Sequence, residues 1–189
     1  MQQIARRFRT WLRDVRITFL PDRKYMVGTI LPALTKLKPQ RVLFVGVQRY
    51  TFKYERQFSP AVSEFWTIDI ASDTAEWGST QHHVIGDIVS ADKHFAPAFF
   101  DIVVLNGIFG HGVNTVADQD RAIAAIRAIS TDRSYLLVGW NPGMSEDPLS
   151  LPAIQSQYIH GQVPGLPDRI DFRVSNHTYD FFTARHPAA

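Results

Sequence analysis

The chain has 189 residues, of which 45% are hydrophobic and 12% aromatic, and this composition excludes a largely disordered protein. Its 20 basic residues barely outnumber its 18 acidic residues, so the net charge of +2 does not indicate nucleic acid as a partner. Cysteine is absent, which excludes disulfides, thiolate metal sites and cysteine nucleophiles. The histidines show no metal-ligand spacing, so we expect no metal site.

The N-terminal segment, residues 1–24, is predicted to form a basic amphipathic helix followed by a turn at Pro21-Asp22-Arg23. Five arginines lie between residues 6 and 16, and apolar residues stand among them at helical spacing: Phe8, Trp11, Leu12 and Val15. This apolar stripe either packs on the rest of the protein or brings the arginines to an anionic membrane surface. No apolar stretch is long enough for a signal peptide or a transmembrane segment, and we expect a cytoplasmic protein.

Residues 25–189 are predicted to form a single domain in which strands and helices alternate. A helix is expected over residues 25–38, bent at Pro32, and the first strand begins shortly after Pro39. Continuous apolar runs, typical of strands buried on both faces of a parallel sheet, occur at 41–46, 64–69, 82–85, 101–105 and 134–138. A further helix is expected over residues 116–130, between the last two of these strands.

The chain is predicted to end in an antiparallel hairpin. Residues 142–167 are rich in proline, glycine and serine, which indicates a long loop with a short helix near residues 153–158. Residues 170–174 and 178–183 alternate apolar and polar side chains on either side of Ser175-Asn176. The expected fold class is therefore α/β: a three-layer, Rossmann-like sheet of mainly parallel strands with a C-terminal antiparallel hairpin.

Polar residues follow the predicted strands at the positions where a parallel sheet binds ligands. Gly46 ends the first strand, and Asp69 ends the second strand 23 residues later. A carboxylate there accepts hydrogen bonds from both hydroxyls of a ribose, although an N-cap of the following helix is an alternative role. Asp87 follows the third strand as a ligand or a turn residue, and Asn106 ends the fourth strand.

Together these residues resemble the class I S-adenosylmethionine-dependent methyltransferases, and the resemblance extends over residues 25–185. It implies S-adenosylmethionine as the cofactor. It also places cofactor-binding residues at the tips of the first four strands: Gly46 and Val47, Asp69 and Ile70, Asp87 and Ile88, and Asn106. In that family the residue at the Asp87 position bonds the exocyclic amine of adenine, and the apolar residue after it packs on the ring.

The chain departs from this family in the loop after the first strand. Only Gly46 matches the usual glycine-rich loop, because Gln48 and Tyr50 stand where later glycines are typical. Tyr50 is a candidate for contact with the acceptor. His111 is a candidate general base or a residue that orders its loop, and Asn106 is the other candidate catalytic residue. Asn106 is followed by Gly-Ile-Phe, so the chain lacks the Asn/Asp-Pro-Pro-aromatic motif of amide methyltransferases.

Three functions are compatible with these patterns. The leading one is methyl transfer from S-adenosylmethionine to a small-molecule, sugar or lipid-precursor acceptor. The altered loop after Gly46 favours instead a non-catalytic protein of the same fold that binds a nucleotide or a protein partner. A nicotinamide-dependent enzyme would need a glycine pattern that this chain lacks, and it would more naturally continue with a parallel sixth strand than with a hairpin.

Overall fold

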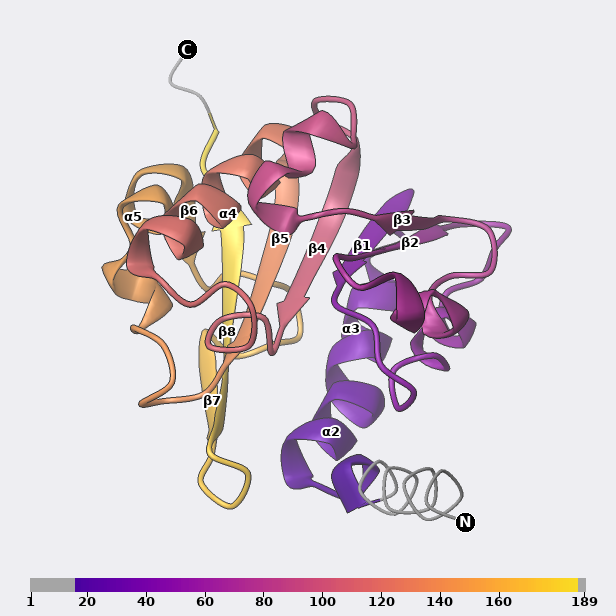
Figure 1. The fold of residues 1–189 in the computed structure, drawn as a ribbon, viewed down its shortest axis with the longest axis horizontal. Helices are drawn as coiled ribbons and strands as arrows, with labels where there is room; N and C mark the ends of the chain where they lie inside the picture. Colours follow the sequence, from indigo (N-terminus) through magenta and orange to yellow (C-terminus); the bar gives the residue numbers. More distant parts are fainter. Residues whose placement is uncertain (1–15, 187–189) are drawn as a thin grey trace.

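The structure of the protein is a computed structural model that describes residues 16–186 (Figure 1). It has an α/β fold built on one mixed sheet with helices on both faces. Most of the basic amphipathic helix predicted within residues 1–24 lies outside the described residues. None of the helices formed by residues 16–186 has the length and apolar character needed to cross a membrane.

The sheet of the described residues has the strand order β3-β2-β1-β4-β5-β8-β6, and β7 also pairs with β8. Strands β1 to β5 are parallel, as predicted, and span Arg41–Val45, Glu64–Asp69, His83–Ile85, Phe100–Asn106 and Ser130–Trp140. Three strands pair antiparallel with β8 (His177–Ala184), namely β5, β6 (Tyr158–His160) and β7 (Arg169–Phe172). The predicted fold class, including the C-terminal hairpin, is therefore confirmed.

Two hydrophobic cores cover the two faces of the sheet and give the fold three layers. Because side chains alternate along a strand, Leu43 and Val45 of β1 point into the first core, and Val42 and Phe44 point into the second. The first core includes residues of α4 (Val116–Ile129), α5 (Pro152–Gln157) and η4 (Ile88–Lys93). The second includes residues of η1 (Met26–Ile30), α3 (Leu31–Lys36) and η2 (Tyr54–Gln57), and Tyr25 of α2 (Pro21–Tyr25) packs against it. The remaining short helices are η3 (Ser72–Trp77) and η5 (Pro148–Ser150).

The helical segment before β1 begins earlier than predicted, because residues 21–23 form the start of α2 rather than a turn. Pro21 occupies the first helical turn, where its missing N–H costs no hydrogen bond. In place of a simple bend at Pro32, the segment contains the π-helical η1, whose carbonyl of Met26 accepts from the N–H of Leu31, five residues later. Pro32 lies directly after this wide turn and has no N–H to bond a carbonyl four residues earlier.

One buried carboxylate, that of Asp180 in β8, holds the C-terminal strands together. It accepts hydrogen bonds from Trp140 Nε1 of β5 at 2.8 Å, His160 Nε2 of β6 at 2.8 Å and Arg169 Nε of β7 at 2.7 Å. A fully buried carboxylate needs donors of this kind to offset the loss of its hydration. Strand β6 lies within the segment predicted to be a loop, and its three residues are too few to show a strand periodicity.

Candidate functional site

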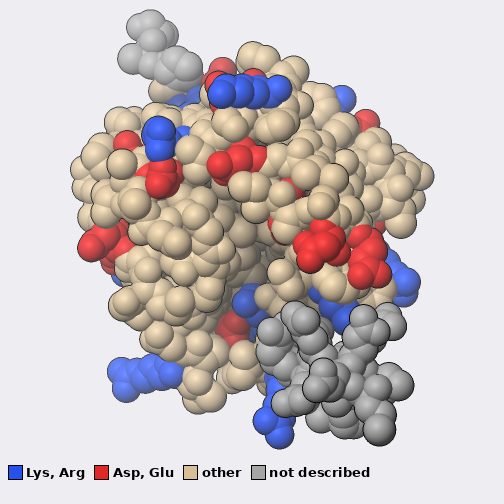
Figure 2. All heavy atoms as spheres, in the orientation of Figure 1, with Lys and Arg blue, Asp and Glu red and all other residues tan. Residues whose placement is uncertain are grey.

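A cavity of about 1110 Å³ lies at the carboxyl edge of the sheet. The tips of β1 to β4, the start of α2 and the hairpin β7–β8 line it. Figure 2 shows this face hollowed, with acidic and basic atoms visible inside the hollow. Pockets for small ligands usually hold about 300–1,000 Å³, so a cavity of this size has room for a nucleoside cofactor and a second molecule. Residues 16–186 contain no group of three or more His, Asp or Glu side chains placed to hold a metal ion.

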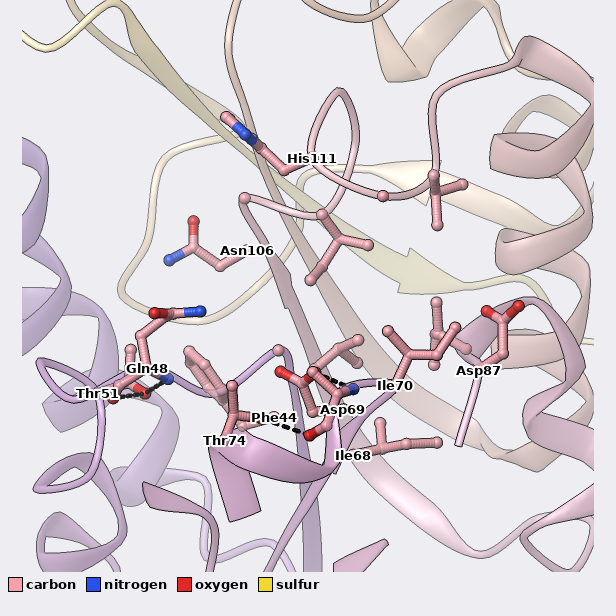
Figure 3. A pocket seen from close by; sticks show the side chains of 18 of the residues that line it. Phe44, Gln48, Thr51, Ile68, Asp69, Ile70, Thr74, Asp87, Asn106 and His111 are labelled. Carbon is pink, nitrogen blue, oxygen red and sulfur yellow. Dashed lines mark hydrogen bonds between the residues drawn. The ribbon is translucent and has the colours of Figure 1, made fainter. Parts of the chain in front are cut away.

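Asp69, at the tip of β2, lies between Gln48 and Asp87 in the cavity (Figure 3). Its Oδ2 accepts a hydrogen bond from the Val47 N–H at 2.8 Å, and its Oδ1 accepts one from the Ala71 N–H at 2.8 Å. The carboxylate thus fixes the backbone on both sides of the β2 tip. Each carboxylate oxygen has a second lone pair, so these bonds leave Asp69 able to accept two further hydrogen bonds from a ligand.

The loop after β1 passes beside Asp69, and its conformation depends on Gly46. Gly46 has a φ of +78°, and a Cβ added there would lie 2.5 Å from Ile108 Cδ1. The backbone angle therefore favours glycine, and a larger residue would also displace the end of the Ile108 side chain. Val47 is buried and does not line the cavity, to which it is linked through its N–H bond to Asp69. Gln48, which stands where a glycine is typical of the family, does line the cavity.

The β2–β3 side of the cavity carries Asp87 and two isoleucines. Asp87 caps η4 by accepting a hydrogen bond from the Val89 N–H through Oδ1 at 3.0 Å, which is the turn role considered from the sequence. Ile88 is only 5% exposed and packs in the first core, so little of its surface faces the cavity. Ile70 is 70% exposed and provides an apolar surface next to Asp69.

Asn106, at the tip of β4, is buried and is held by a residue of the C-terminal hairpin. Its Oδ1 accepts a hydrogen bond from His177 Nε2 at 3.0 Å. The pair fits because of Gly139, where an added Cβ would lie 2.2 Å from Asn106 Oδ1 and 2.9 Å from His177 Nε2. Burial, followed by the nearby charge of Arg23, lowers the pKa of His177 to about 4. The imidazole is therefore neutral near pH 7, and its single N–H orients the Asn106 amide.

His111 and Tyr50 line the same cavity as Asn106. In Figure 3, Asn106 and His111 lie on the side of the cavity away from Asp87. His111 is exposed, and its loop is closed by a backbone bond from its N–H to the Ile108 carbonyl at 3.0 Å. This backbone bond helps to order the loop.

Two charged residues predicted to lie in a turn, Asp22 and Arg23, also line the cavity. The side chains of Arg23 and Asp22 are 14% and 2% exposed, and Arg23 Nε lies 3.4 Å from Asp22 Oδ2 in an ion pair that lacks hydrogen-bond geometry. Arg23 Nε, Arg23 Nη1 and Asp22 Oδ1 have no hydrogen-bond partner among the described residues. A buried polar group without a partner costs roughly 1–3 kcal/mol. The described part of the protein therefore leaves hydrogen-bonding groups of both Arg23 and Asp22 without a partner.

No protein-family model and no curated protein matches the sequence. Solved structures do match the fold. The N-methyltransferase NodS of Bradyrhizobium japonicum WM9, in complex with S-adenosyl-L-homocysteine, is 12% identical with a TM-score of 0.65, over 89% of this chain and 90% of that one. A TehB-like SAM-dependent methyltransferase of Corynebacterium glutamicum is 13% identical with a TM-score of 0.63, over 98% of this chain and 100% of that one. The chain therefore has the fold of class I S-adenosylmethionine-dependent methyltransferases, as the sequence resemblance implied.

Proposed function

We propose that this protein transfers a methyl group from S-adenosylmethionine to a small-molecule acceptor. The observation that carries the proposal is the cavity at the carboxyl edge of a methyltransferase fold, where Asp69 and Asp87 lie on one side and Asn106 and His111 on the other. Open parallel sheets bind nucleosides at this edge, because the loops that follow the strands meet there.

The residues on the β2–β3 side fit the nucleoside part of the cofactor. Each Asp69 oxygen accepts one backbone N–H and retains a lone pair, which matches the two hydroxyls of a ribose. The exposed side chain of Ile70 offers an apolar surface to adenine. Asp87 uses Oδ1 for the Val89 N–H, and its Oδ2 suits the exocyclic amine of adenine. Gly46 lets the backbone approach the methionine part closely, since it adds no side chain to the cavity.

The residues on the other side fit the acceptor. When bound, the cofactor supplies a methyl group on a sulfonium, an activated leaving group, so the protein needs chiefly to align the acceptor and exclude water. Asn106, which His177 holds in one orientation, would bind and align the acceptor. His111 would take the proton that a hydroxyl or amine acceptor must lose. Tyr50 would form part of the acceptor wall.

Thermal unfolding with S-adenosylmethionine, S-adenosylhomocysteine, NAD and NADP tests the proposal. A ligand at about 100 times its Kd stabilises the folded state by roughly 2.7 kcal/mol. For a domain of this size, that is a rise of about 5–10 °C in the unfolding midpoint. We expect a rise with the two S-adenosyl ligands and none with the two nicotinamide ligands. A rise with NAD or NADP alone would replace the proposal with a nicotinamide-dependent function.

The altered loop after β1 favours a second function, binding without methyl transfer. Gln48 and Tyr50 place side chains on the cavity wall where the family typically has glycine. If these side chains close the cofactor site, neither S-adenosyl ligand will change the unfolding midpoint of the natural protein, and Gln48→Gly will restore the response. An equal rise of the unfolding midpoint in the natural protein and in Gln48→Gly would show that Gln48 does not close the cofactor site.

A further inference from the structure

We propose that Arg23 binds an anionic oxygen group, a carboxylate or a phosphate, on the methyl acceptor. This inference rests on the proposed methyl transfer and adds the chemical class of the acceptor. It starts from Arg23, an arginine that lines the cavity and that has two buried nitrogens, Nε and Nη1, that donate to no described residue. A guanidinium presents a planar fork of N–H donors, and carboxylates and phosphates match that fork.

The surroundings of Arg23 hold its side chain in place for a ligand. The guanidinium carbon lies over the Tyr50 ring, 5.2 Å from its centre, in a cation–π contact. Tyr179 of β8 donates a hydrogen bond from its hydroxyl to the Asp22 carbonyl at 3.3 Å, which ties the start of α2 to the sheet. Burial opposes the charge of Arg23, but Tyr179, Tyr50, Tyr54 and Asp22 outweigh it and raise the pKa of the guanidinium above its ordinary value. Arg23 is thus a charged and oriented donor.

The distribution of charge in the cavity points an anion toward Arg23 rather than toward the strand tips. The acids Asp69, Asp87 and Asp92 line the β2–β3 side. Two other described basic residues line the cavity, and both differ from Arg23: Lys93 is exposed on η4, and Arg121 is 67% exposed and paired with Asp118. A buried cation attracts an anion more strongly than an exposed one, because less water screens it.

Asp22 is the counter-ion of Arg23, and it satisfies the hydrogen-bonding capacity of the guanidinium poorly. The contact of 3.4 Å between Arg23 Nε and Asp22 Oδ2 is too poorly aligned for a hydrogen bond, and Oδ1 of Asp22 has no partner. An anionic acceptor would supply the aligned acceptors that Asp22 does not. The two carboxylates would repel each other, so neutralising Asp22 should strengthen the binding of an anion.

The experiment measures the binding of four small probes to the full chain by calorimetry, with and without S-adenosylhomocysteine. Benzoate and phenyl phosphate carry the two anionic groups, benzamide is a neutral analogue of benzoate, and benzylamine carries the opposite charge. We expect an anionic probe to bind most tightly, and the tighter of the two identifies the group. Arg23→Gln should weaken that probe by about 10–100-fold, the loss expected for one or two bonds to a charged group. Asp22→Asn should tighten it, and Arg23→Lys, which keeps the charge but not the fork, should weaken it less.

Arg121→Gln is the matched control, because Arg121 is also an arginine on the cavity wall. Equal losses in Arg23→Gln and Arg121→Gln would overturn the proposal, since they would reflect general electrostatics. Preferential binding of benzylamine that Asp22→Asn abolishes would also overturn it and would assign a cationic acceptor to Asp22. If Arg23→Gln fails to fold, the opposite effects expected of Arg23→Lys and Asp22→Asn decide the question.

The two proposals fail separately in this experiment. Binding of S-adenosylhomocysteine without any preference for an anion would refute the role of Arg23 and leave methyl transfer standing. Binding of an anion through Arg23 without any binding of S-adenosylhomocysteine would refute methyl transfer and leave the anion site standing.

Discussion

Replacing Asp69 with alanine should remove two supports of the backbone together with a candidate ribose ligand. The carboxylate joins the loop after β1 through the Val47 N–H and the start of η3 through the Ala71 N–H, both at 2.8 Å. A hydrogen bond to a charged group contributes roughly 1.5–3 kcal/mol, so the two bonds together contribute about 3–6 kcal/mol. Asp69 is partly exposed, and water will replace part of this loss. We therefore expect a decrease of about 3 kcal/mol in the free energy of unfolding.

Urea and thermal unfolding measure this effect. For a domain of 150–250 residues, about 3 kcal/mol corresponds to a decrease of roughly 6–12 °C in the unfolding midpoint. Asp73→Ala is the matched control, because Asp73 is an exposed aspartate in the neighbouring η3. We expect it to change the free energy of unfolding by no more than about 0.5 kcal/mol. Asp69→Asn retains one acceptor oxygen and should fall between the two.

An Asp69→Ala midpoint equal to that of Asp73→Ala would refute the supporting role of Asp69. Ligand binding needs a separate measurement, since a less stable protein can bind less ligand merely because part of it is unfolded. Calorimetry well below the midpoint of Asp69→Ala meets this need. Loss of S-adenosylhomocysteine binding in the folded variant would support the ribose role, and unchanged affinity would remove Asp69 from the proposed cofactor site.

Two further predictions concern the Asn106–His177 pair. Burial lowers the pKa of His177 from 6.5 to about 4. Between these two pH values the unfolded chain therefore binds a proton that the folded protein does not. As the pH falls from 6.5 to 4, the free energy of unfolding should decrease by up to about 3 kcal/mol. Urea unfolding across this window should show a flatter pH dependence in His177→Gln, and parallel curves would contradict the burial argument. Gly139→Ala should lower the free energy of unfolding by about 1–3 kcal/mol, because the new Cβ would lie 2.2 Å from Asn106 Oδ1. Gly28→Ala, in a helix with nothing within 4 Å of the new Cβ, should instead raise it by roughly 0.5–1 kcal/mol, and equal unfolding midpoints for the two variants would refute the crowding at Gly139.

The elements with long apolar runs could be predicted well from the sequence. The run 64–69 coincides with β2, and the helix predicted over 116–130 is α4, Val116–Ile129. Such runs are informative because both faces of a central parallel strand are buried. The three-residue β6 gave no comparable signal, and it forms because β8 offers it an edge to pair with. Local pattern therefore defines the centre of the sheet, and tertiary pairing defines its C-terminal edge.

The candidate site divides in the same way. Asp69, Asp87 and Asn106 could be predicted to lie near one another because the carboxyl ends of parallel strands meet at one edge. The position of His177 beside Asn106 could not be predicted, since the two residues are 71 positions apart and His177 begins the antiparallel strand β8. Asp22 and Arg23 follow a proline that suggested a turn, yet proline is also favoured at the start of a helix. Pro21 followed by an acidic residue is the signal that indicates the helix start.

The π-helical η1 sets the direction in which α2 faces relative to α3. An α-helix rotates by about 100° and advances about 1.5 Å per residue, and a π turn accommodates one extra residue. If the same residues formed a continuous α-helix from Pro21 to Lys36, with α3 still packed on the sheet, the extra residue would no longer be absorbed. Asp22 and Arg23 would then rotate by about 100° around the helix axis, away from the cavity. The orientation of the charged pair thus depends on the hydrogen-bond pattern of η1, and a change in that pattern alone would turn both charges away from the cavity without altering any side chain that lines it.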